Sequence, residues 1–108
     1  MAYFTGESSL RYKFKDKDLK LLYIEEKNSH SYPESVVKAF FYCMFVIDNA
    51  KDLRDLYALK SLHFEKLSGN RKDQHSIRLN AKYRLTLLIE NDEAGKLLLI
   101  LEIVDYHK

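Results

Sequence analysis

Arginine and lysine side chains gather in one stretch of this 108-residue chain, where they could bind phosphate groups. Between Lys60 and Arg84 there are seven basic residues against two acidic ones, a net charge of +5, whereas the rest of the chain carries 11 basic and 14 acidic residues, a net charge of −3. A basic patch on an otherwise acidic protein favours a polyanionic partner such as nucleic acid. A solvated loop rich in lysine would give the same count, so charge alone leaves both interpretations open.

Three of these basic residues, Arg78, Lys82 and Arg84, are separated by even numbers of residues. Within one continuous strand they would lie on the same face of a sheet, although a turn near Asn80 and Ala81 would interrupt that strand. Two arginines on a sheet face could clamp a phosphate through paired hydrogen bonds and offset the charge that develops during transfer. The alternative is that these arginines pair with surface carboxylates.

A second group that could do chemistry is Asp105-Tyr106-His107, which follows the last apolar segment. The end of a strand beside a basic loop would hold a reactive group and leave it accessible. The imidazole of His107 titrates near neutral pH and suits proton transfer. Tyr106 could stack on a base or hold a phosphate oxygen, and Asp105 could orient the imidazole or support an arginine. Taken alone, however, a histidine beside the end of a chain is more often a frayed tail residue.

The signatures of other sites are missing from the sequence. The four histidines match no zinc spacing and Cys43 is the single cysteine, so we expect neither a metal site nor another cofactor. There is no glycine-rich phosphate loop and no nucleophile elbow. The lone thiol indicates a reducing compartment, the first residues do not resemble a secretory signal, and no apolar run is long enough to span a bilayer. We therefore expect a cytoplasmic protein that does not associate with membranes.

These candidate residues need a scaffold, and the first half of the chain predicts a strand followed by helices. We expect a single domain over residues 1–108, with residues 1–9 as a loose lead-in. Residues 10–14 alternate as in a half-exposed strand, and Asp16 or Asp18 is expected to cap the helix that follows. Pro33 fits the first turn of a helix from about Glu34 to Asn49. The apolar stripe of that helix is the strongest helical signal: Val36, Val37, Phe40, Phe41, Met44, Phe45 and Ile47.

The second half of the chain predicts mainly strands. Asp52 is expected to cap a short helix whose inner side carries Leu53, Leu56 and Tyr57, and residues 60–74 read as a polar, basic connection. Two-fold alternation over 75–80 and 83–89, a turn at 91–95 and an almost continuous apolar strand at 97–104 follow. The order predicts an α+β fold in which an N-terminal strand and helices pack on one face of a mainly antiparallel sheet.

Three segments of the chain resemble a known family. The segment Phe64–Leu85 (FEKLSGNRKDQHSIRLNAKYRL) resembles the central motif of HigB-type toxins in the RelE/ParE superfamily, also called the plasmid maintenance system killer family. The ending EIVDYH at 102–107 is similar to that family's C-terminal signature, and FKDKDLKLLY at 14–23 is similar to its first strand and helix. The resemblance spans roughly residue 11 to the end. One position departs from the family's motif: Ser68 stands where several members of the family carry a lysine before the turn glycine.

The resemblance implies a RelE-like fold and the toxin of a type II toxin–antitoxin system that enters the ribosomal A site and cleaves mRNA there. It implies a catalytic group of Arg84, Asp105, Tyr106 and His107 for a metal-independent, in-line attack by the ribose 2′-hydroxyl. In that reaction His107 would transfer a proton, Arg84 would stabilise the charged phosphate and Tyr106 would orient the RNA. The basic residues expected to grip ribosome and mRNA, in contacts that weaken steeply with salt, are Lys60, Lys66, Arg71, Lys72, Arg78 and Lys82.

The implied partner is a cognate HigA-like helix-turn-helix antitoxin, which would neutralise the toxin. The toxin would contact operator DNA only through this antitoxin. Two alternatives stay open. The chain could be a non-catalytic protein that kept the fold and the binding of RNA and antitoxin but lost cleavage through changes such as Ser68. It could also be a protein-interaction domain with no role in RNA chemistry.

Overall fold

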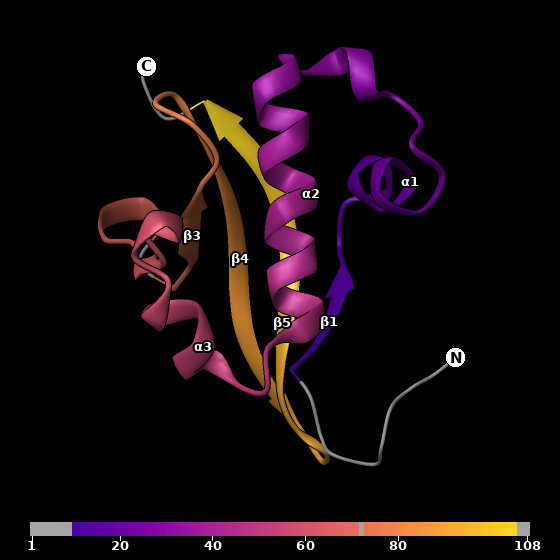
Figure 1. Ribbon diagram of the computed structural model, residues 1–108. Helices are drawn as coiled ribbons and strands as arrows, with labels where there is room; N and C mark the ends of the chain where they lie inside the picture. The colour runs from indigo at the N-terminus through magenta and orange to yellow at the C-terminus, as the bar shows by residue number, and fades with distance from the viewer. Residues whose placement is uncertain (1–9, 72, 106–108) are drawn as a thin grey trace.

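The protein is described here by a computed structural model that covers residues 10–71 and 73–105. Figure 1 shows its helices and strands. They follow one another as β1 (Arg11–Phe14), α1 (Lys17–Glu25), α2 (Glu34–Asn49), α3 (Leu53–Ala58), β2 (Glu65–Lys66), β3 (His75–Arg78), β4 (Tyr83–Asp92) and β5 (Gly95–Asp105), with short 3-10 turns η1 (Ser29–Ser31), η2 (Lys60–Leu62) and η3 (Gly69–Arg71).

The five strands form one sheet in the order β1-β5-β4-β3-β2. β1 pairs with β5 in parallel, and the other pairs are antiparallel. Figure 1 shows α2 lying across one face of this sheet and α1 beside it, next to β1. The arrangement confirms the predicted α+β architecture with helices on one face of a mainly antiparallel sheet. We call the opposite side of the sheet the open face.

Helix α2 buries one side against the sheet, which makes it the main element of the core. Its buried side carries Val36, Phe40, Cys43, Met44, Val46 and Ile47. Burial raises the pKa of the Cys43 thiol to about 12, so the thiol stays protonated at neutral pH. Pro33 stands just before the helix, with an extended ψ of 149°, rather than within its first turn as predicted. Its carbonyl accepts hydrogen bonds from the amides of Val36 and Val37.

Two aromatic residues predicted to face the core are exposed. The side of α2 that carries Phe45 points away from the sheet, and 61% of Phe45 is exposed. The apolar stripe of the sequence is broader than the side of the helix that contacts the sheet, so periodicity alone placed Phe45 wrongly. On α3, Asp52 caps the helix as expected and Leu56 is buried, but Tyr57 is exposed and contacts the ring of Phe64 edge-on.

The segment predicted as a plain connection, residues 60–74, contains the edge strand β2. Glu65 pairs with Ser76, and Lys66 pairs with His75. A strand of two charged residues has no apolar alternation, so the sequence pattern did not indicate it. The strand matters because it adds a carboxylate to the open face of the sheet.

Two local features set the register of β3, β4 and β5. The side-chain oxygen of Asn80 accepts hydrogen bonds from the amides of Lys82 and Tyr83, both at 2.8 Å, and this closes the turn between β3 and β4. Along β4 and β5 the pairing shifts, because Thr86 pairs with Glu102 whereas Leu87 pairs with Ile100. One extra residue in β5 therefore forms a bulge that brings Glu102 alongside Thr86.

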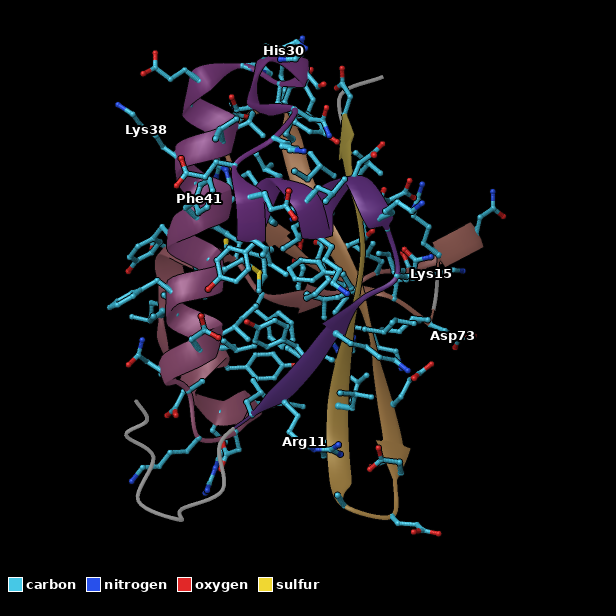
Figure 2. All side chains as sticks on the ribbon, turned by 90° about the vertical axis from the view of Figure 1, so that its right-hand side faces the viewer. Arg11, Lys15, His30, Lys38, Phe41 and Asp73 are labelled. Atoms are coloured by element: carbon cyan, nitrogen blue, oxygen red, sulfur yellow. The ribbon has the colours of Figure 1, made fainter. Side chains whose placement is uncertain are left out.

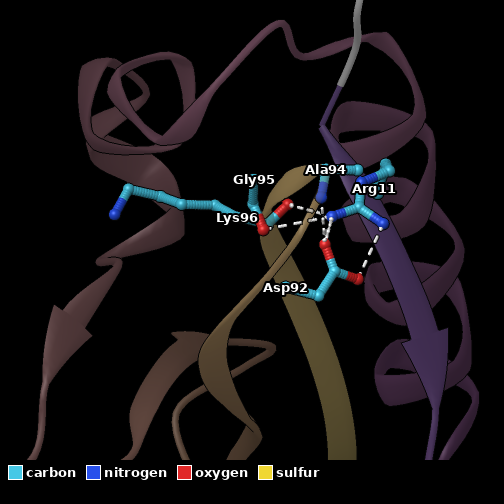
Figure 3. Close-up of polar contacts among 5 residues, drawn as sticks. All are labelled: Arg11, Asp92, Ala94, Gly95 and Lys96. Carbon is cyan, nitrogen blue, oxygen red and sulfur yellow. Dashed lines mark hydrogen bonds and ion pairs between the residues drawn. The ribbon is translucent and has the colours of Figure 1, made fainter.

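Arg11 holds the far end of the β4–β5 hairpin against β1. Its guanidinium donates to the two carboxylate oxygens of Asp92 at 3.2 and 2.6 Å, and to the carbonyls of Gly95 and Lys96 at 3.1 and 3.3 Å (Figure 3). The hydrogen bond from Arg11 lowers the pKa of Asp92. Because β4 runs to Asp92 and β5 starts at Gly95, the turn is shorter than the predicted 91–95.

His75, at the start of β3, lies on the core side of the sheet and gives folding a pH dependence. Its ring stacks on that of Phe64, with the ring centroids 5.1 Å apart. Its Nδ1 is buried and has no hydrogen-bond partner among the described residues. Burial, and then the charge of Lys66, lower the pKa of His75. The unfolded chain thus binds a proton near pH 6.5 that the folded chain takes up only at lower pH, so stability is lost as the pH falls below about 6.5.

We therefore expect the urea midpoint of the wild type to fall between pH 7 and pH 5 more steeply than that of a His75→Phe variant, which keeps the ring stacking. A His30→Gln variant, changed at an exposed histidine, is the control and should keep the wild-type slope. Equal slopes in the wild type and His75→Phe would show that His75 is not the group responsible.

Candidate nucleic-acid interface on the open face

A row of four polar residues crosses the open face of the sheet. Glu65 on β2 pairs with Ser76 on β3, Ser76 with Thr86 on β4, and Thr86 with Glu102 on β5. Residues paired directly across strands project to the same face, so these four side chains form one line, which we call the polar row. Ser76 and Thr86 are fully buried beneath neighbouring side chains, and Glu65 and Glu102 mark its two exposed ends.

Arg84 lies beside the polar row and is held by the two residues at one end of that row, Glu65 and Ser76. The guanidinium donates from Nη1 to Glu65 Oε2 at 2.9 Å and to Ser76 Oγ at 3.1 Å. Only 20% of the Arg84 side chain is exposed, compared with 54% for Glu65. The arginine is therefore oriented by the sheet while one side of the site is open to solvent, and an incoming phosphate would compete with the Glu65 carboxylate for the guanidinium.

A second arginine lies directly opposite the first. Arg78 on β3 pairs with Arg84 on β4, which places the two Cβ atoms about 5 Å apart on the same face. The expectation of a shared face is confirmed for these two residues, but they reach it from two paired strands and not from one strand. Lys82 is exposed in the turn between them. Like charges at directly opposed positions repel one another, and an anion bound between them would remove that cost.

The other end of the polar row carries a second cluster. Arg71, from η3, donates from Nη1 to Gln74 Oε1 at 3.1 Å and approaches Glu102 Oε2 at 3.5 Å. Beside this cluster is a hollow with a volume of about 340 Å³, which we call the Glu102 hollow; it is lined by Lys15, Asp16, Gln74, Leu101 and Glu102. Figure 2 shows Lys15 on the side of the sheet away from α2.

Of the remaining predicted residues, some lie away from the open face and others lie outside the described chain. Lys60 in η2 and Lys66 in β2 are exposed. Lys66 pairs with His75, so by strand alternation its side chain leaves β2 on the side opposite to the polar row. Asp105 pairs with Tyr83, so by strand alternation its side chain leaves the sheet on the α2 side, opposite to that of Arg84. Ser68 is exposed, directly before Gly69, whose φ of +70° fits the predicted turn. Lys72, Tyr106 and His107 lie outside the described residues.

Sequence reasoning missed four residues of this interface: Glu65, Ser76, Thr86 and Glu102. No motif marks them, because their proximity is produced by strand pairing and by the bulge in β5. The even spacing of Ser76 from Arg78, and of Thr86 from Arg84, was the available signal, since it places each on the same face as an arginine.

Neither a metal centre nor a membrane span is found in the part of the chain that the structure describes. Within residues 10–71 and 73–105, no three His, Cys, Asp or Glu side chains are grouped so that they could hold a metal ion. Over the same ranges, no helix is both long enough and apolar enough to cross a membrane.

Comparisons with known proteins point to one family. The sequence profile of the family described as "RelE-like toxin of type II toxin-antitoxin system HigB" matches residues 12–107. Toxin HigB-1 of Vibrio cholerae serotype O1 is 39% identical over 72 residues, which cover 67% of this chain and 76% of that protein.

Solved structures of toxins share the fold. A chain of the YoeB-YefM complex from Staphylococcus aureus superposes with a TM-score of 0.53 and 21% identity, covering 94% of this chain and 100% of that one. The YoeB/ParE toxin from Agrobacterium tumefaciens gives a TM-score of 0.50 and 13% identity, covering 93% and 99%. These similarities confirm the RelE-like fold predicted from the sequence.

Proposed function

Because this chain belongs to the family of RelE-like HigB toxins of type II toxin–antitoxin systems, we propose that it is a ribosome-dependent endoribonuclease that cleaves mRNA. The observation that carries the proposal is the placement of Arg84, fixed by Glu65 and Ser76 directly opposite Arg78 on the open face. Two guanidiniums on one face can hold a phosphodiester and stabilise the charge that builds up on it. RNA cleavage is also the activity that the family resemblance implies.

The proposed reaction is an in-line attack of a ribose 2′-hydroxyl on the adjacent phosphate. Arg84 and Arg78 bind the phosphate, and the Glu65 carboxylate, displaced from Arg84, is within reach to accept the 2′-hydroxyl proton. The bond to the leaving 5′-oxygen breaks, and His107 supplies the proton to that oxygen. Tyr106 orients the RNA, and no role at the phosphate is proposed for Asp105, whose side chain leaves the sheet on the opposite face. The products are a 2′,3′-cyclic phosphate and a 5′-hydroxyl end, so the step is balanced without a metal.

The proposed binding surface extends from the two arginines along the exposed basic residues of the same region. Lys60, Lys66, Lys72 and Lys82 would contact the backbone of rRNA and mRNA, together with Arg71 at the other end of the polar row. Such contacts release counterions, so ribosome binding should fall steeply as salt is raised. Restricting cleavage to mRNA on the ribosome requires that the ribosome present the strand to the open face.

We further propose that a protein antitoxin neutralises the chain in the cytoplasm. The Staphylococcus aureus neighbour was solved as a complex of YoeB with YefM, and this supports an antitoxin partner. For this chain the partner proposed is a HigA-like helix-turn-helix protein, which would also bring the toxin to operator DNA.

The test is induced expression of the chain in bacterial cells without its antitoxin, with growth and mRNA integrity followed together. We expect growth arrest with mRNA fragmentation, relief of both by His107→Ala, and relief by co-expression of a helix-turn-helix protein encoded beside this chain. Growth arrest with intact mRNA would contradict RNA cleavage. Binding of the antitoxin without arrest would indicate the alternative, a protein that kept the fold but lost catalysis.

A further inference from the structure

We propose that the Glu102 hollow binds the nucleobase next to the scissile phosphate and selects guanine. The inference rests on the proposed function, since it assigns the specificity of the same interface. Glu102 is two residues along β5 from Val104, which pairs with Arg84. The Arg84 guanidinium contacts Ser76, and Ser76 lies two strand spacings, roughly 10 Å, from Glu102 along the polar row. A nucleotide whose phosphate lies on Arg84 can therefore place its own base, or the adjacent one, in the hollow.

Apart from Asp16, which caps α1, the lining of the hollow offers one acceptor group and two donor groups. The Glu102 carboxylate is the acceptor, and the donors are the Lys15 ammonium and the amide nitrogen of Gln74. The amide oxygen of Gln74 already accepts from Arg71 at 3.1 Å, which leaves its NH₂ group as the part that can bind a base. The Asp16 carboxylate caps α1 through Oδ1, which accepts from the amides of Asp18 and Leu19 at 2.7 and 3.3 Å, and this holds the carboxylate at the start of the helix.

Guanine is the base that matches this set. Its N1–H and N2–H₂ groups are adjacent donors that can satisfy both oxygens of a carboxylate, and its O6 and N7 are acceptors for the ammonium and the amide. Uracil has a single N–H donor between two carbonyls, and adenine and cytosine present only one amino group to the carboxylate. The Leu101 side chain adds an apolar surface against which a base can lie.

The contact between Arg71 and Glu102 does not compete strongly with a base. Their closest N–O distance of 3.5 Å is long for an ion pair, and the two side chains are 38% and 48% exposed. A solvent-screened pair of this kind contributes little, so Glu102 can turn toward a guanine edge at low cost. Arg71 then remains beside Gln74 and can contact the RNA backbone.

The experiment measures cleavage by the purified full-length protein on ribosomes carrying mRNAs that differ only in the base on either side of the cut. We expect the wild type to cut the guanine mRNA about tenfold faster than the uracil mRNA, as a two-point hydrogen bond to a base allows. Glu102→Gln should abolish that preference, because a glutamine amide cannot accept from both donors. Lys15→Ala, which leaves Arg71 and Glu102 untouched, should lower the preference several-fold.

The control is Glu25→Gln, changed at an exposed carboxylate of α1 that pairs with Lys27, and it should keep the wild-type preference. A loss of structure would slow cleavage of all mRNAs alike, so the ratio between bases separates recognition from folding. Cleavage without a guanine preference, or an unchanged preference in both Glu102→Gln and Lys15→Ala, would overturn this inference and leave the proposed function standing. Absence of cleavage on every mRNA would overturn both.

Discussion

An Arg84→Ala variant is expected to lose roughly a hundredfold to a thousandfold in the rate of mRNA cleavage on the ribosome, the size of effect seen when one oriented donor to a transition-state charge is removed. The residue is held in place before substrate arrives, because its guanidinium contacts Glu65 and Ser76 and little of it is exposed. An oriented donor needs no rearrangement when the phosphate becomes more negative, and this is why its removal should affect the rate more than ribosome binding. Single-turnover rates measured at saturating ribosome concentration would separate these two effects.

The matched control for this variant is Arg54→Ala. Arg54 is also an arginine with a carboxylate partner, Asp52, but it lies on α3 and its side chain is 90% exposed. Loss of Arg54 should leave cleavage unchanged, and circular dichroism should show that both variants are folded. Equal, nearly normal rates for both variants would show that Arg84 does not act on the phosphate.

A Phe40→Ala variant is expected to lower the free energy of unfolding by about 3–5 kcal/mol, because it leaves a large cavity in the core. Phe40 is fully buried on α2. Its ring lies 5.7 Å from that of Phe41, 6.3 Å from that of Tyr23 and 6.5 Å from that of Phe14, so it connects α2 to α1 and to β1. Few single changes in a chain of this size should cost more.

Phe45→Ala is the matched comparison, since it makes the same chemical change one and a half turns along the same helix. Phe45 is mainly exposed, so its removal should change the free energy of unfolding by less than about 0.5 kcal/mol. Urea unfolding followed by circular dichroism measures both values. Similar losses in the two variants would mean that the buried side of α2 is not the one described here.

The sequence allowed most of the fold to be predicted where one periodicity dominates. The bounds of α2 follow from its apolar stripe, and the long strands follow from two-fold alternation and a continuous apolar run. Periodicity does not say which part of a broad stripe the sheet will cover, and Phe45 was misplaced for that reason. Periodicity also does not predict a two-residue strand such as β2, which forms by pairing with β3.

The candidate site was predictable only in part, because half of it is made by register. Arg84 was found from its charge and its motif, and spacing predicted the face that Arg78 and Arg84 share but not that they pair across two strands. Glu65 and Glu102 could not be predicted, since one depends on an edge strand and the other on a bulge. Local sequence does not record directly which strands lie side by side. The family resemblance suggested the proposed function, and the comparisons confirmed the family.

The measurement that tests the central claim most directly is cleavage of a defined mRNA by the purified protein, with and without ribosomes. The mRNA is compared with an otherwise identical molecule that carries a 2′-O-methyl group at the nucleotide before the cut. We predict that the unmodified mRNA is cut only on the ribosome, leaving a 2′,3′-cyclic phosphate and a 5′-hydroxyl, and that the methylated mRNA resists. Equal cutting of the methylated mRNA, or equal cutting of free and ribosome-bound mRNA, would contradict the mechanism proposed for the open face.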